Sequence, residues 1–181
     1  MDPARSGAYL ASGTGRLAAH VISVLQKRQT PYQQGVRQFI FDYLSRAVVY
    51  QPEFRADLVL AELRGFRLGV DTIIDNYIPA VATELGDMWV RSDVDFAQVT
   101  IGALRLQSLL VEASAESVPV LYNAARDTTL LLVVPEGEQH FLGASVVAAQ
   151  LRRLGCSVTT SFCEPHEALM ARVLNAHMNA V

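Results

Sequence analysis

The hydrophobic spacing of this chain changes character near residue 120, and that change limits the folds open to it. From about Leu17 to Ser117, apolar residues recur at three- and four-residue steps, which is typical of amphipathic helices. From Thr128 onward, short apolar runs alternate with helical spacing, which is typical of an α/β unit. We therefore predict an α + α/β protein with a flexible N-terminus over 1–16, a helical bundle over 17–117, a linker over 118–127 and an α/β unit over 128–181.

Local start signals divide the helical part. Thr30 before Pro31 predicts one helix start, because threonine caps free amides and proline is preset for a first helical turn. Pro52 predicts the start of a second helix, and Asp71 is placed to cap a third. Pro79 lies inside that third helix, where we expect a kink.

A fourth helix follows Asp95, which forms a capping-box pattern with Gln98 three residues later. The three stripes that we expect to face inward are Val36, Phe39, Ile40, Tyr43, Leu44 and Val48; Ile74, Tyr77, Ile78, Val81, Leu85, Met88 and Trp89; and Phe96, Val99, Ala103, Leu106, Leu110 and Ala113.

The second part begins with a continuous β-branched and leucine run, as expected for a strand buried on both faces of a parallel sheet. The predicted elements are a strand over Thr128–Val134, a helix over Phe141–Leu154 ended by Gly155, a strand over Cys156–Phe162, a helix from Pro165 and the start of a third strand over Asn179–Val181. Because a parallel sheet needs more than two strands to cover its faces, we expect this part to be the N-terminal portion of a larger unit.

Composition narrows the classes of function. The net charge of −3 comes from mixed charges with no basic block, which argues against strong unaided binding to nucleic acid. Two cysteines, Cys156 and Cys163, make neither a disulfide framework nor a zinc pattern, so we expect a protein of the reducing cytoplasm. The apolar run Leu130–Val134 is too short to span a bilayer, and no membrane association is expected. We find no nucleophile–base set that would indicate an enzyme.

The loop after the first strand contains the strongest candidates for ligand binding. Open α/β sheets bind ligands at the carboxyl ends of their strands, and the loop Pro135–His140 follows such an end. His140 is a candidate metal ligand, and Glu138 can hydrogen-bond the ring nitrogen that does not face the metal. Gly143 would let the backbone approach a bulky ligand. Taken alone, the same residues also describe a solvated polar loop.

This loop resembles the Asp-x-His-x-x-Gly signature of cobalamin-binding domains, with Glu138 in place of the aspartate and with His140 and Gly143 matching directly. The resemblance implies a Rossmann-like cobalamin-binding domain in which His140 is the lower axial ligand of cobalt. It also implies further cofactor-contacting elements, a serine motif and a glycine pair, that would lie beyond Val181.

The segment Leu85–Trp89 and the helix from Phe96 resemble the four-helix cap over cobalamin in methionine synthase and in CarH-type photoreceptors. The resemblance implies that Trp89 packs over the upper ligand, although a buried tryptophan in a bundle can equally be plain core. The photoreceptor cap has a Glu-His pair where this chain has Val99 and Thr100, so the upper-face chemistry differs here.

The stretch Val99–Gln107 looks like the AerR/PpaA regulators of purple photosynthetic bacteria, and this likeness runs through nearly the whole chain. It implies a cobalamin-binding, light-responsive antirepressor without enzymatic activity. Its partner would be a DNA-binding repressor of photosynthesis genes of the CrtJ/PpsR type, and DNA would be involved only indirectly.

Three alternatives stay open. Relatives of the same architecture use haem in place of cobalamin, and a histidine ligand suits either macrocycle. A corrinoid carrier for a methyltransferase uses the same histidine motif. A helical interaction module without a cofactor is the third. The sequence leaves open whether the cobalamin is the hydroxo, methyl or adenosyl form.

Overall fold

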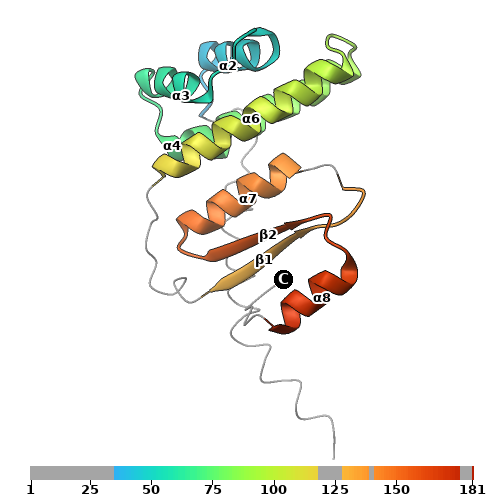
Figure 1. Cartoon of the computed structure of the whole chain (residues 1–181). Helices are drawn as coiled ribbons and strands as arrows, with labels where there is room; N and C mark the ends of the chain where they lie inside the picture. Colours follow the sequence, from blue (N-terminus) through green and yellow to red (C-terminus); the bar gives the residue numbers. More distant parts are fainter. Residues whose placement is uncertain (1–34, 118–127, 139–140, 176–180) are drawn as a thin grey trace, which may run out of the picture.

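A computed structural model describes residues 35–117, 128–138, 141–175 and 181 of the chain. A helical layer formed by α2 to α6 lies against α7, and α7 in turn covers one face of the small sheet made by β1 and β2, with α8 on the other side (Figure 1). The prediction of a helical part followed by an α/β part is confirmed at this level. The predicted flexible N-terminus, the linker, His140 and most of the third strand lie outside the described residues.

The first two described helices are α2 (Gln38–Tyr50) and α3 (Ala56–Gly65). The helix start predicted at Thr30 and Pro31 lies outside the described residues, and α2 begins after Gly35, whose φ of 123° lies outside the helical region. Pro52 lies in the connection between the helices, not at a helix start. Arg105 binds the end of α2. Its guanidinium donates hydrogen bonds to the carbonyls of Val48 and Gln51 at 2.7 Å each.

The next helical stretch is irregular at its centre. It runs through α4 (Val70–Thr72), the π-helical turn η2 (Ile73–Tyr77) and α5 (Ile78–Val90). The π-helical turn immediately precedes Pro79, which has no N–H for a regular helical bond. The kink expected at Pro79 itself stays a prediction. The predicted cap was wrong: Gly69 is the N-cap, and Asp71 lies within the helix, where it binds Arg153.

Helix α6 (Phe96–Glu116) begins with the predicted capping box. The Gln98 N–H donates to the Asp95 carboxylate at 2.7 Å, and the Asp95 N–H donates to the Gln98 side chain at 2.9 Å. At Gly102 the helix approaches α5 so closely that an added Cβ would lie 2.9 Å from a Leu85 methyl group. Phe96 was expected to face inward, but it is 71% exposed because it precedes the part of α6 that the other helices cover.

The α/β part follows the predicted order: β1 (Thr129–Val134), α7 (Phe141–Arg153), β2 (Ser157–Phe162) and α8 (His166–Asn175). The strands pair in parallel, with Thr129 opposite Ser157 and Val134 opposite Phe162. Gly155 has a φ of 93°, which confirms its left-handed conformation after α7. Burial of β1 on both faces was expected, yet only Leu131 and Val134 are buried and the other four residues are half-buried, since in the described chain each strand is also an edge.

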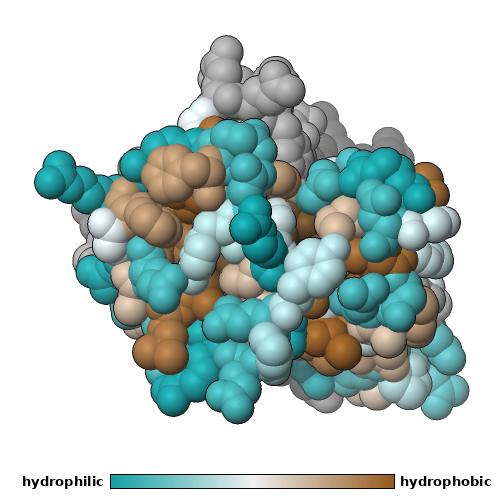
Figure 2. All heavy atoms as spheres, turned by 90° about the horizontal axis from the view of Figure 1, so that it is seen from above, coloured by the Kyte–Doolittle hydropathy of each residue, from teal (hydrophilic) through white to brown (hydrophobic). Residues whose placement is uncertain are grey.

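The two parts share one interface. Val146 and Ala149 of α7 belong to the same apolar core as the helical layer. At the end of α7, Arg153 forms ion pairs with Asp71 at 2.8 Å and Asp75 at 2.6 Å, and Gln150 donates a hydrogen bond to Asp75 at 2.9 Å. The helical layer therefore holds α7 in a defined position relative to the sheet. Seen from above, its outer surface alternates apolar and hydrophilic side chains (Figure 2).

Candidate functional site

The candidate site lies at the carboxyl ends of β1 and β2, where the loop after β1 leads into α7 (Figure 1). The loop begins as a tight turn: the Glu138 N–H donates to the carbonyl of Pro135 at 3.2 Å, and Gly137 adopts a φ of 87°. Glu138 is half-buried in this turn. His140, the predicted metal ligand, lies outside the described residues, so its predicted hydrogen bond with Glu138 stays a prediction.

Gly143 lies in the first turn of α7, immediately after the loop. It is exposed, and apart from its own helix backbone a Cβ placed on it would meet no atom of the described residues within 4 Å. Packing against the described elements therefore does not require a glycine there. A backbone without a side chain is what a bulky ligand approaching the start of α7 would need.

Two aromatic rings in contact lie at this edge of the sheet, and they were not predicted from the sequence. Phe141 begins α7 and Phe162 ends β2, and their ring centroids are 5.6 Å apart at an interplanar angle of 57°. Both rings are exposed although they contact each other. The sequence did place Phe162 at the end of one predicted strand and Phe141 just after the loop that follows the other. Their contact could not be predicted, because it depends on the parallel register of the strands.

The loop after β2 is fixed beside these rings. Ser161 donates a hydrogen bond to Glu164 at 2.6 Å, and Arg172 of α8 forms an ion pair with the same carboxylate at 3.0 Å. Burial raises the pKa of the Cys156 thiol at the opposite end of β2, whereas Cys163 is exposed near the site. The loop after β2 is therefore held by two side-chain contacts at this edge of the sheet.

Helix α6 extends over the start of α7. Gln107 donates a hydrogen bond to Ser145 of α7 at 3.1 Å, which fixes the relative position of the two helices. Thr100 lies about two turns before Gln107 on the same side of α6, roughly 11 Å along its axis. The N-terminal half of α6 therefore continues beyond the contact with α7 on the side of the loop after β1.

Val99 and Thr100 differ in their exposure. Val99 is half-buried and packs against the apolar core of the helical layer. Thr100 is exposed, and its hydroxyl donates to the carbonyl of Phe96 at 2.8 Å, one turn earlier in the same helix. Of the two predicted upper-face residues, only Thr100 is available to a ligand.

Trp89 lies in the last turn of α5, one turn beyond the buried Leu85 and on the same face of the helix. It is 53% exposed, so it is not an ordinary core tryptophan. The connection to α6 is fixed by Arg91, which forms ion pairs with Glu84 at 2.8 Å and Asp93 at 2.9 Å. The α5–α6 connection thus carries two exposed aromatic side chains, Trp89 and Phe96.

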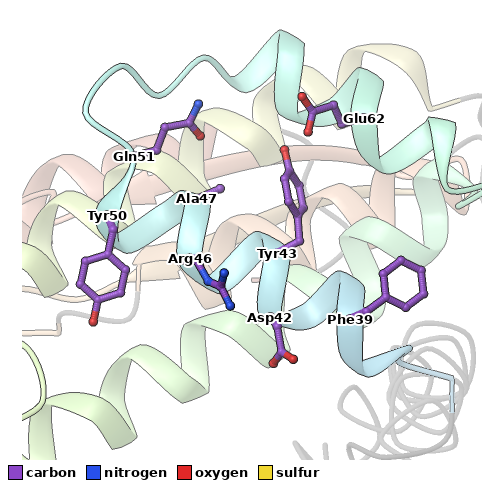
Figure 3. A pocket seen from close by; sticks show the side chains of 8 residues that line it. All are labelled: Phe39, Asp42, Tyr43, Arg46, Ala47, Tyr50, Gln51 and Glu62. Carbon is purple, nitrogen blue, oxygen red and sulfur yellow. The ribbon is translucent and has the colours of Figure 1, made fainter.

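An open groove in the described part of the chain lies away from this site. A groove of about 620 Å³ runs along α2 and α3 and is lined by Phe39, Asp42, Tyr43, Arg46, Ala47, Tyr50, Gln51 and Glu62 (Figure 3). Burial and the neighbouring Glu62 raise the pKa of Tyr43 above its ordinary value. The groove is far from the strand ends and contains none of the predicted site residues.

Two searches of the described residues bear on the predicted metal site and on membrane association. No three histidine, cysteine, aspartate or glutamate side chains within the described ranges lie close enough together to hold a metal ion. None of the helices in the described part of the chain combines the length and apolar character needed to cross a membrane.

Comparison with known proteins identifies a relative in Rhodobacter capsulatus. It is described as an uncharacterized 20.5 kDa protein in the bchF-crtJ intergenic region and is 42% identical over 106 residues. The match covers 59% of this chain and 55% of the relative, so the chain spans about half the length of that protein. No protein-family model matches the chain.

Proposed function

We propose that this chain binds a cobalamin at the carboxyl ends of β1 and β2, with His140 as an axial ligand, and that the bound cofactor controls contact with a transcriptional repressor. The observation that carries the proposal is the exposed Phe141–Phe162 pair beside the loop that leads to His140. Two exposed aromatic rings in contact offer an apolar surface that a ligand can cover. Their position is where open α/β sheets bind ligands.

The described residues fit a large planar macrocycle. Such a group supplies its own equatorial metal ligands and needs only one axial side chain from the protein, so a cluster of several metal-binding residues is not required. The aromatic pair offers an apolar surface, and Gly143 presents backbone without a side chain. Glu138 lies two residues before His140, close enough in sequence to orient an imidazole.

The helical layer would form the upper side of the site. Thr100 and Phe96 lie on the part of α6 that extends past α7, and Trp89 lies in the last turn of the neighbouring helix. Because the Thr100 hydroxyl proton is donated to Phe96, its oxygen can accept a hydrogen bond but offers only weak metal ligation. We propose that these side chains exclude water from the upper face of the cofactor without coordinating its metal.

The cofactor would supply a light-sensitive bond between cobalt and its upper ligand. The protein would respond through α6, because Gln107 and Ser145 connect that helix to α7 beside the site. Such a response requires two states of the protein with different affinity for the partner.

The proposed partner is a repressor of the CrtJ/PpsR type. The support is the name of the relative, which places that protein between bchF and crtJ in Rhodobacter capsulatus. We propose that this chain weakens the binding of such a repressor to its operator. Labelled operator DNA bound by the repressor would be titrated with the cofactor-loaded chain in the dark and after illumination, with anisotropy as the readout. Equal anisotropy in the presence and absence of the chain would refute the regulatory part of the proposal.

Cofactor binding is tested by absorption spectroscopy. Purified protein is incubated with hydroxocobalamin in the dark or in light, freed of excess cofactor and compared with His140→Ala and His166→Ala. His166 is an exposed histidine at the start of α8, so its replacement controls for nonspecific imidazole ligation. We expect retained cobalamin bands in the wild type and in His166→Ala, and their loss in His140→Ala.

A parallel incubation with haemin separates the two macrocycles. Retention of a haem absorption band that depends on His140, without retention of cobalamin, would replace cobalamin by haem in the proposal. Equal retention of cobalamin by all three proteins would refute ligation by His140.

A further inference from the structure

Helix α6 carries a second apolar stripe that points away from the core. Its members are uncharged, and the structure exposes every one of them: Ala97, Ile101, Leu104, Ser108, Val111 and Ala115. Successive members are four and three residues apart in strict alternation, which is the spacing of a coiled-coil seam. The outward face of a surface helix is ordinarily charged and polar, so this stripe is suited to contact with another helix.

Two other faces of α6 make contacts within the described chain. Gly102, Leu106, Leu109, Leu110 and Ala113 are buried against the helical layer, and Gln107 contacts α7. The described elements leave the stripe uncovered, and α6 crosses the front of the molecule in Figure 1 with no described element drawn over it.

The order of residues in the stripe identifies its occupant. Read in either direction from a point at Leu106, the stripe is self-complementary: Ala97 lies opposite Ala115, Ile101 opposite Val111, and Leu104 opposite Ser108. A two-fold axis at Leu106 would therefore bring small residues together at both ends. It would also place branched residues opposite each other and the large leucine against the small serine at the centre. Isologous two-fold interfaces require this kind of matching.

We propose that the stripe is the interface between two copies of this chain, whose α6 helices pair in antiparallel orientation about a two-fold axis at Leu106.

The charges beside the stripe are compatible with this pairing. Gln98, Arg105 and Glu112 lie on one flank of the stripe. On that flank Gln98 of one protomer faces Glu112 of its partner, so no two acidic side chains face each other. Arg105 lies opposite its own symmetry mate across the axis. Its guanidinium is held by the carbonyls of Val48 and Gln51 in its own protomer, at 2.7 Å each, and does not extend across the seam.

The expected dimer is weak. A helix of 21 residues is about 30 Å long, and one such contact buries less surface than the roughly 800 Å² per partner of a typical stable complex. We therefore expect a dissociation constant in the micromolar range. The proposal does not depend on a cofactor, so it is tested on protein prepared without one.

Sedimentation velocity from low micromolar to several hundred micromolar protein measures the association. The test variant is Leu104→Glu, which places two like charges near the two-fold axis at a position that is 63% exposed in the protomer. The matched control is Leu58→Glu on α3, where the leucine is 55% exposed and lies off the stripe. We expect the Leu104 variant to weaken dimerisation by at least about 100-fold and the control to leave it unchanged, with circular dichroism confirming that both are folded.

Crosslinking tests the orientation. In a Cys163→Ser background, Ile101→Cys and Val111→Cys proteins are treated with a short bismaleimide separately and as a mixture. In the antiparallel pair, residue 101 lies level with residue 111 of the partner but about 15 Å along the axis from its own symmetry mate. We expect efficient crosslinking in the mixture only. A wild type that stays monomeric at all concentrations, as it would if the stripe served a different protein, overturns the proposal, and so does crosslinking of each variant with itself.

Discussion

The ion pairs of Arg153 allow a quantitative test of how the helical layer and the α/β part are joined. We consider the replacement Arg153→Met, which keeps most of the apolar length of the side chain and removes its charge. Arg153 is 7% exposed, and its two partners differ in exposure: Asp75 is 15% exposed and Asp71 is 60% exposed. The two ion pairs therefore contribute unequally.

The expected cost follows from these exposures. The pair with Asp71 is largely solvated and contributes between about 0 and 1 kcal/mol. Breaking a fully buried ion pair costs about 3–5 kcal/mol because the remaining charge loses its partner. Asp75 would keep the hydrogen bond from Gln150 and its slight exposure to water, so a value at or just below the lower end of that range is appropriate. We expect Arg153→Met to lower the free energy of unfolding by about 2–3 kcal/mol.

Urea denaturation followed by circular dichroism measures this change. The control is Arg152→Met, because the neighbouring Arg152 is exposed and donates one hydrogen bond, to the carbonyl of Val158 at 2.8 Å. Its replacement should cost about 1 kcal/mol or less. A free energy of unfolding for Arg153→Met within about 0.5 kcal/mol of the wild type would refute the argument. So would a wild-type transition in two separate steps, since a shared core predicts a single cooperative transition.

Two further predictions concern packing and reactivity. Gly102→Ala should destabilise the protein by about 1 kcal/mol in urea denaturation, because overpacking against Leu85 costs roughly 1–3 kcal/mol and the better helix propensity of alanine returns at most about 1 kcal/mol; a stabilised variant would contradict the close approach of α5 and α6. In native protein a thiol-reactive dye should label Cys163 rapidly and Cys156 slowly, because burial shields the Cys156 thiol and raises its pKa. Rapid labelling of both cysteines would contradict the packing of α7 on β2.

The features predicted well from the sequence depend on residues close together in the chain. The capping box of Asp95 and Gln98 and the left-handed Gly155 are set by the backbone within one turn, and both were confirmed. The order of strands and helices after Thr128 was also correct, because the change from period-2 and continuous apolar runs to helical spacing is a local property.

The features predicted wrongly depend on contacts between distant segments. Pro52 has a local helix-start signal, but Arg105 holds the preceding carbonyls from another helix and delays the start of α3 to Ala56. Asp71 has the side chain of a cap, but its carboxylate is used by Arg153, which is far away in sequence. Local cap and turn signals cannot report such partners.

The candidate site likewise has one part that could be predicted from local sequence and one part that could not. The loop after β1 could be identified from its position behind an apolar strand, whereas the Phe141–Phe162 pair required the parallel register. The outward stripe of α6 was missed for another reason. Its alternating spacing matches that of the inward stripe, and periodicity alone does not tell which of two apolar stripes on one helix faces the core.

Three consecutive residues of α6 show how one helix serves three surfaces. Thr100 is exposed on the side toward the candidate site, Ile101 belongs to the outward stripe, and Gly102 is packed against Leu85 in the core. Helix backbones and packed cores deform little, so these three positions move together when α6 moves. A ligand that displaces Thr100 by moving α6 would therefore also move the outward stripe and change the contact of Gly102 with Leu85. If the site binds a ligand and the stripe pairs two copies of the chain, as proposed, the affinity of the stripe for a second copy is linked to the state of the site.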